Sequence, residues 1–198
     1  VARIGRRGWL APLVLFGALA VAAIPLVRAL RRPLIELGPR PDFSAAPAAG
    51  AAVRLMLPDG ERLELRPGSA SYQMASFLAG VEPVPARFAL APFNFRFASA
   101  EPTPESMATL DEVAAILRAY PSATVRVESY TDSLGAASAN LDLSRDRSET
   151  VKGLLLDKGI DPARVATAGL GPLNPVASNE TERGRAENRR TEIVVTGR

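Results

Sequence analysis

The sequence has 198 residues, 47% of them hydrophobic, so it is long enough for one domain with its own core plus additional segments. It contains no cysteine, which excludes disulfides, thiolate metal sites and a lipidated cysteine within this sequence. It also contains no histidine, the usual general base and metal ligand, so any catalysis would depend on carboxylate, Lys, Tyr or Ser chemistry.

The net charge of +3 is unevenly distributed along the chain. Residues 1–50 contain seven arginines against two acidic residues, a net charge of +5. Residues 51–198 contain 17 basic and 19 acidic residues, a net charge of −2. Because the basic residues flank an apolar segment, we interpret them as the flanks of a membrane segment and expect no nucleic-acid partner.

Residues 1–30 are predicted to form an N-terminal membrane anchor. The apolar run from Trp9 to Val27 would extend about 28 Å as a helix, close to the hydrocarbon thickness of a bilayer. The alternative is a cleaved signal peptide, with a small-x-small site at Ala18-Leu19-Ala20. The run continues past that site and Arg28 follows it, so we favour an uncleaved transmembrane helix over residues 9–27. The run lacks Asp, Glu and Lys, which argues against an ion path through it.

Residues 31–52 are rich in Pro, Ala and Gly and are predicted to be an extended linker or a hinge. Within residues 53–87, alternating apolar residues around Pro58-Asp59-Gly60 predict a β-hairpin, and a short amphipathic helix is expected from Ser71 to Leu78. We expect this segment to be an additional layer on the main domain, because a lone hairpin is marginally stable. A docking site for a partner is the alternative.

The remaining residues, 88–198, predict alternating strands and helices. Strands are expected at residues 88–97, 124–129, 164–168 and 191–195. Helices are expected from Thr103 or Pro104 onward, from about 136 to 158 and at 184–190. Gly169-Leu170-Gly171 is assigned to a turn, because Pro172 follows it in place of a phosphate-binding helix start. The order β-α-β-α-β-(α)-β predicts an α+β sandwich with helices on one face of a mixed sheet.

One face of the helix at 136–158 is polar at its beginning and apolar at its end. Helical spacing places on this face Asn140, Leu143, Ser144, Arg147, Val151, Leu154 and Leu155. Asp132 follows the preceding strand, so Asp132 and Arg147 should lie at neighbouring element ends. Desolvating both charges is costly unless each has a partner. The spacing alone leaves open whether they form an internal salt bridge or bind a ligand.

The pattern from Thr131 to Arg147, T-D-x-x-G-x4-N-x2-L-S-x2-R, resembles the signature of the C-terminal domain of outer-membrane protein A and its relatives, including peptidoglycan-associated lipoprotein and the flagellar stator B proteins. Further segments that match this family are Phe93-Asn94-Phe95, Thr103-Pro104-Glu105, Pro175 to Asn179, Gly184-Arg185-Ala186 and Asn188-Arg189-Arg190. The resemblance covers about half of the chain. Two departures are Tyr130, where the family usually has His, and Arg96, where it commonly has Asp.

The resemblance implies a peptidoglycan-binding domain over residues 88–198, without catalytic activity, cofactor or metal. The implied ligand is the peptide stem of peptidoglycan, usually its diaminopimelate residue, which has carboxylates and an ammonium group. Arg147 can bind a carboxylate through two N–H groups, and Asp132 can accept from an ammonium or from backbone N–H groups.

Four further residues complete the implied site. Thr131 and Asn140 would supply uncharged hydrogen bonds, and Leu143 would supply an apolar wall. Arg189 is assigned to the ligand site. The alternative is that Arg185 and Arg189, four positions apart, form a solvated face with Glu182 and Glu192.

Two functional hypotheses follow. The first is a single-pass protein of the inner membrane of a Gram-negative-type bacterium, whose periplasmic domain binds peptidoglycan and tethers the wall to the membrane or to an envelope complex. Signal cleavage would instead release it to the periplasm or outer membrane. The second is an envelope adaptor or assembly protein that docks a partner on the hairpin of residues 53–66 and binds the wall weakly or not at all. A protein partner and a homo-oligomer stay open, whereas a wall hydrolase is disfavoured because no acid/base pair is evident.

Overall fold

The computed structural model describes residues 51–198. The predicted transmembrane helix at 9–27 and all but the last two residues of the predicted linker lie outside this range. Among the residues that are described, no helix is both long enough and apolar enough to cross a bilayer.

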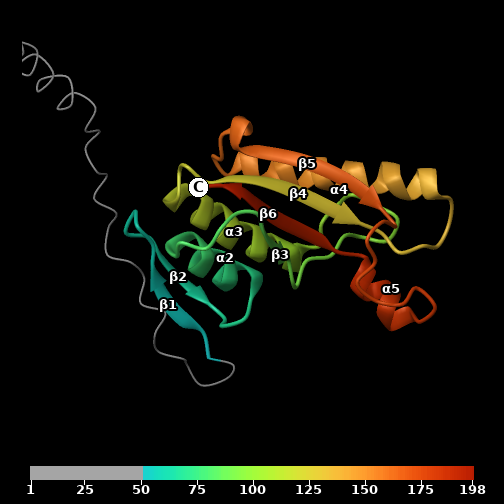
Figure 1. Cartoon of the computed structure of the whole chain (residues 1–198), viewed down its shortest axis with the longest axis horizontal. Coiled ribbons are helices and arrows are strands. Elements are labelled where there is room, and N and C mark those ends of the chain that lie inside the picture. Colours follow the sequence, from blue (N-terminus) through green and yellow to red (C-terminus); the bar gives the residue numbers. More distant parts are fainter. Residues whose placement is uncertain (1–50) are drawn as a thin grey trace, which may run out of the picture. The chain divides into compact units, whose positions relative to one another are not determined.

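A four-stranded mixed sheet forms the centre of the described domain (Figure 1). Its strands are β3 (Ala86–Ala89), β4 (Thr124–Tyr130), β5 (Val165–Gly171) and β6 (Thr191–Gly197). They are arranged in the order β3-β6-β4-β5. β4 and β5 are parallel, whereas β6 is antiparallel to both β3 and β4. The C-terminal strand therefore lies inside the sheet, and the parallel and antiparallel pairs together make the sheet mixed, as predicted.

Two long helices, α3 (Pro104–Ala119) and α4 (Ala137–Asp157), lie on the same side of this sheet (Figure 1). Their apolar residues pack against Val125 and Val127 of β4 to form the core. A 3-10 turn at Pro162–Arg164 precedes β5, and the short helix α5 (Glu182–Asn188) precedes β6. The observed order β3-α3-β4-α4-β5-α5-β6 agrees with the predicted α+β sandwich.

The predicted hairpin is formed by β1 (Val53–Met56) and β2 (Arg62–Leu65), and it is followed by α2 (Ala70–Ala79). Gly60 in its turn has a φ of 88°, a left-handed conformation that Gly adopts readily. The apolar side of the hairpin is buried in the same core as the sheet, through Leu55, Leu57 and Leu65. This packing is what an additional layer on the domain requires.

The predicted strand from Phe88 to Phe97 is wrong after Ala89. β3 ends at Ala89, and a single bridge joins Phe95 to Pro102. Pro92 has no N–H group to donate, so the ladder cannot continue through it. The segment from 90 to 102 instead forms a loop at the end of the sheet.

The predicted turn at Gly169-Leu170-Gly171 is also wrong, because these residues are the last part of β5. A Cβ atom at Gly169 would lie 2.2 Å from the backbone nitrogen of Arg145 in α4. Glycine is needed here because α4 packs directly on the strand. The glycine at position 169 therefore indicates close packing of a helix on a strand and not a change of chain direction.

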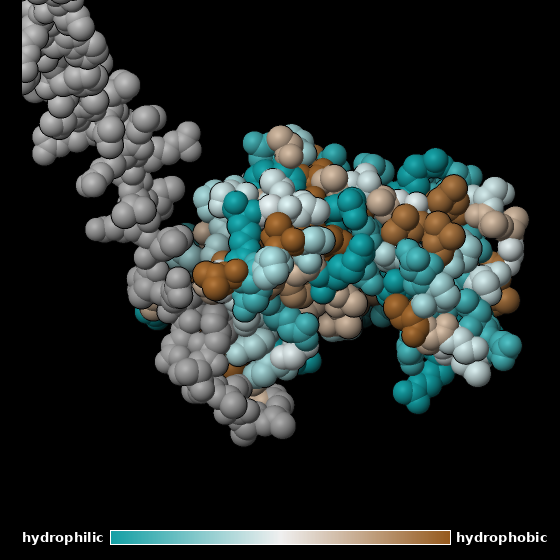
Figure 2. Space-filling model, in the orientation of Figure 1, coloured by the Kyte–Doolittle hydropathy of each residue, from teal (hydrophilic) through white to brown (hydrophobic). Residues whose placement is uncertain are grey.

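The sheet face turned away from the helices carries charged side chains, and Figure 2 shows hydrophilic residues with scattered hydrophobic ones on it. Side chains alternate along β4, so Glu128 lies on this face while Val127 faces the helices. Glu128 is only 2% exposed. We call this group of side chains the open-face cluster: Arg87, Arg126, Glu128, Tyr130, Arg190 and Glu192.

Candidate functional site

The loop between β4 and α4 is shaped by three of the predicted site residues. Oδ1 of Asp132 accepts a hydrogen bond from the backbone N–H of Leu134, at 3.0 Å. Nδ2 of Asn140 donates to the carbonyl of Leu134 at 2.8 Å and to that of Asp132 at 3.4 Å. Gly135 has a φ of 87°, which disfavours other residues there. Asn140 therefore holds the loop, and Thr131 does so too, because its hydroxyl donates to the carbonyl of Asp132 at 2.8 Å.

Arg189 lies in the site and connects two carboxylates. Its Nη1 donates to Oδ2 of Asp132 at 2.8 Å, and its Nη2 donates to Oε1 of Glu182 at 2.9 Å. The hydrogen bond with Asp132, followed by that with Glu182, raises the pKa of the Arg189 guanidinium. Of the two solvent-face partners considered from sequence, only Glu182 pairs with Arg189; Glu192 pairs with Arg190 and Arg87.

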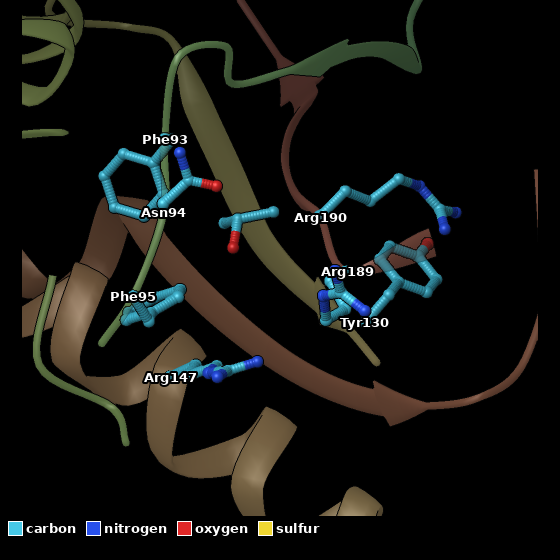
Figure 3. A pocket seen from close by; sticks show the side chains of 8 residues that line it. Phe93, Asn94, Phe95, Tyr130, Arg147, Arg189 and Arg190 are labelled. Atoms are coloured by element: carbon cyan, nitrogen blue, oxygen red, sulfur yellow. The ribbon is translucent and has the colours of Figure 1, made fainter. Parts of the chain in front are cut away.

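Arg147 projects from α4 and is 9% exposed. Its Nε donates to the carbonyl of Ser99 at 2.9 Å, and its guanidinium carbon lies 4.8 Å from the ring centre of Phe95, beside which Figure 3 shows it. Within residues 51–198 it forms no ion pair, and neither of its Nη nitrogens has a hydrogen-bond partner. Burial lowers the pKa of Arg147, and the positive charge of Arg189 lowers it further, while Asp132 acts in the opposite direction.

The structural alternative of an Asp132–Arg147 salt bridge is not what the structure contains. The carboxylate of Asp132 pairs with Arg189. Arg147 is left as a buried cation next to a carboxylate that already has a partner. Such a guanidinium is costly to desolvate and is suited to an anionic ligand.

A cleft of about 670 Å³ lies between the β4–α4 loop and the 94–98 segment. All six residues predicted from sequence line this cleft, namely Thr131, Asp132, Asn140, Leu143, Arg147 and Arg189. The other residues around it are Asn94, Phe95, Arg96, Phe97, Ala98, Leu134 and Glu182. The structure thus brings the predicted residues together, although it contains no ligand and their binding roles stay predictions. Across residues 51–198, no group of three or more acidic side chains is placed so that it could hold a metal ion.

Sequence reasoning missed two asparagine side chains, Asn179 and Asn188, that hold the loops around the site. Oδ1 of Asn188 accepts from the backbone N–H groups of Val176 and Ala177, at 2.8 and 3.0 Å. Nδ2 of Asn188 donates to Oδ1 of Asn179, which also accepts from the N–H of Ser133. Both asparagines lie in the segments that carried the family resemblance, but no role was assigned to them. They join the loop before α5 to the loop that carries Asp132.

The comparison with known proteins identifies this domain. The OmpA family model matches residues 94–189, which include every side chain of the cleft. Residues 94–189 therefore form an OmpA family domain. OmpA-like domains are structural, non-catalytic modules, so the prediction of a domain without catalytic activity is confirmed for residues 94–189.

Individual relatives match the same half of the chain. A probable lipoprotein of Escherichia coli, YiaD, is 44% identical over 107 residues, which are 53% of this chain and 49% of that protein. The peptidoglycan-binding protein ArfA of Mycobacterium tuberculosis is 42% identical over 104 residues, 52% of this chain and 32% of that protein. The chain thus spans about half or less of the length of these relatives.

A solved structure supports the fold. The crystal structure of a putative MotB-like protein from Desulfovibrio vulgaris is 26% identical, with a TM-score of 0.53. The similarity covers 65% of this chain and 90% of that one. It therefore extends over most of the residues that the structure describes.

Proposed function

We propose that this OmpA family domain binds the peptide stem of peptidoglycan without catalysing a reaction, and that it does so through a diaminopimelate-type residue in the Asp132/Arg147 cleft. The observation that carries the proposal is the state of Arg147. It is a largely buried guanidinium whose two terminal nitrogens are unpaired within residues 51–198. A bound carboxylate would restore the charge pairing that the protein itself does not provide.

The rest of the cleft suits a ligand that carries both charges. Each carboxylate oxygen of Asp132 already accepts one hydrogen bond, from Leu134 or from Arg189, but each has a further lone pair with which to accept from an ammonium. Diaminopimelate offers carboxylates and an ammonium on one short chain. Phe95 and Leu143 provide apolar walls for its methylene groups. The name of the relative ArfA, a peptidoglycan-binding protein, supports the same ligand class.

We also propose that the apolar run at residues 9–27 anchors this domain to the inner membrane, so that it tethers the wall from the periplasm. The support is the length of the run and its arginine flanks. Relatives named as lipoproteins and outer-membrane proteins support an envelope location in general. Recovery of the chain from the inner-membrane fraction after alkaline washing is expected, and recovery only in the outer membrane would contradict the anchor.

Co-sedimentation of the full chain with purified peptidoglycan sacculi tests wall binding. The variants are Asp132→Ala and Arg147→Ala. Each is expected to lower the affinity by about 10- to 100-fold, because each removes a charge that contacts the ligand in a desolvated site. Unchanged sedimentation of Arg147→Ala would contradict the proposal.

The matched control is Arg145→Ala. Arg145 lies on the same helix and has the same charge, but its side chain is 59% exposed, pairs with Asp142 and does not line the cleft. It should sediment like the wild type. A loss of binding in this control would indicate a general effect of positive charge rather than a site.

A further inference from the structure

The cleft is lined by charged side chains of both signs, and the arginines outnumber the carboxylates. The charged residues of its lining are Arg96, Arg147, Arg189, Asp132 and Glu182. Both carboxylates are bound by the same arginine, Arg189. Among the side chains that line the cleft, Arg147 and Arg96 therefore have no carboxylate partner. The proposed function uses Arg147 and gives no role to Arg96.

Within the described residues Arg96 pairs with one carboxylate, that of Glu101, which lies outside the cleft lining. Nη2 of Arg96 and Oε1 of Glu101 are 3.3 Å apart, and the two side chains are 62% and 59% exposed. An ion pair between groups this exposed contributes little free energy, because water screens both charges. A guanidinium also has five N–H groups, so Arg96 can bind another carboxylate beside Glu101 or in its place.

The backbone of Arg96 belongs to a loop that is connected to Arg147. The N–H of Arg96 donates to the carbonyl of Glu101 at 2.8 Å, and its carbonyl accepts from the N–H of Ser99 at 3.1 Å. The carbonyl of Ser99 in turn accepts from Nε of Arg147 at 2.9 Å. These hydrogen bonds hold the backbone of Arg96 in place relative to the arginine to which we assign the first carboxylate.

Exposed apolar side chains lie on both sides of the cleft. Phe97, the neighbour of Arg96, is 99% exposed, and Leu134 on the β4–α4 loop is 59% exposed. Both line the cleft. Exposed apolar surface that is gathered at one place, unlike single scattered residues, marks a surface that a ligand covers. A ligand that extended from Arg147 to Phe97 would also come beside Arg96.

From these observations we infer that the cleft binds two carboxylates of one ligand, the first at Arg147 and the second at Arg96. This inference rests on the proposed function and adds a specificity to it, because a stem whose second carboxylate is free binds more tightly than one in which it is amidated. The resemblance leads one to expect Asp at position 96, and an aspartate there would repel a carboxylate.

The stem offers the second carboxylate at two places. One is the α-carboxylate of the γ-linked D-glutamate. The other is the diaminopimelate carboxylate next to the bond with that glutamate, whereas the carboxylate beside the free ammonium is the one assigned to Arg147. The charge and the chemistry are the same in both cases, so the experiment must distinguish the two sources.

Calorimetric titration of the full chain with three synthetic peptides tests the inference. The first is N-acetyl-L-Ala-γ-D-Glu-diaminopimelate, and the other two are amidated at one or the other of these two carboxylates. The wild type is expected to bind one amidated peptide about threefold more weakly, the size of effect that an exposed ion pair allows. The peptide that is weakened identifies the carboxylate that Arg96 binds. The loss should be absent in Arg96→Gln, and Arg96→Asp should prefer the amidated peptide.

The matched control is Arg145→Gln. Arg145 is 59% exposed and pairs with Asp142, much as Arg96 pairs with Glu101, but it does not line the cleft. It should discriminate between the peptides as the wild type does, and a loss of discrimination here would overturn the inference in favour of a general charge effect. Equal affinity of the wild type for all three peptides, or a loss that persists in Arg96→Gln, would also overturn it and leave the proposed function standing. Failure of the wild type to bind any of the three peptides would overturn both.

Discussion

Two groups of buried charge contain a carboxylate from β4 or from the loop that follows it, and they differ in whether every charge has a partner. In the open-face cluster, Glu128 accepts from Tyr130 at 2.7 Å, from Nε of Arg126 at 2.7 Å and from Arg87. Burial opposes ionisation of Glu128, but these hydrogen bonds outweigh it and hold the pKa of the carboxyl below its usual range. Four residues later, Asp132 pairs with Arg189 and leaves Arg147 without a carboxylate.

The comparison distinguishes a charge that stabilises the fold, that of Glu128, from a charge that we propose binds a ligand, that of Arg147. The lowered pKa of Glu128 means that its ionised form is favoured in the folded protein. The lowered pKa of Arg147 means the opposite for a cation, because its charged form is disfavoured by burial. Glu128 and Arg147 are both buried, but the charge of Glu128 stabilises the fold because it has ion-pair partners, whereas the charge of Arg147 destabilises it because it has none within residues 51–198.

Glu128→Gln is expected to have the largest effect on stability. It removes the charge that compensates two arginines, and breaking a buried ion pair by removing one partner is strongly destabilising. Because Arg87 and Arg126 are 53% and 41% exposed, solvent screens part of this cost, and a loss of about 2–3 kcal/mol in the free energy of unfolding is expected. Urea denaturation at pH 7 measures it. Binding to sacculi should be unchanged, and a loss of both would show that the cluster and the cleft are not independent.

Acid titration sharpens the same prediction. A carboxyl whose pKa is lowered on folding contributes stability above its unfolded pKa, and the contribution is lost as the pH falls through the folded value. The difference in unfolding free energy between the wild type and Glu128→Gln should thus be constant from pH 7 to about 5 and then shrink as the pH falls below about 4.5. A difference that did not shrink at all below about pH 4.5 would mean that Glu128 acts through packing rather than charge.

The parts of this fold that follow from local periodicity were predictable. The face of α4 predicted from helical spacing is the buried face, with Ser144, Arg147, Val151 and Leu155 enclosed and Asn140 at its start. The hairpin and the start of α3 at Pro104 also follow from turn and cap residues. These features depend on neighbours within a few residues, which a sequence displays directly.

The pairing of charges was not predictable, because it depends on contacts between distant segments. Asp132 and Arg189 are 57 positions apart, and nothing in their spacing distinguishes this pair from Asp132 and Arg147. The loop at 90–102 has both kinds of cause: Pro92, a local feature, prevents the ladder from continuing, whereas the hydrogen bond from Arg147 to the carbonyl of Ser99 joins distant segments. The site was located from the motif, but its charge balance required the structure.

Arg147→Met is expected to have the smallest effect on stability, and it is the sharpest test of the comparison. Met keeps the unbranched apolar stem up to about the position of Nε while it removes the unpaired buried charge and its contact with Phe95, and the lost hydrogen bond to Ser99 is offset by the relief of desolvation. The free energy of unfolding should remain within about 1 kcal/mol of the wild type, or exceed it, while binding to sacculi is lost. A loss of more than about 3 kcal/mol, as expected for breaking a buried ion pair, would show that Arg147 has a partner in the free protein and is a structural residue like Glu128.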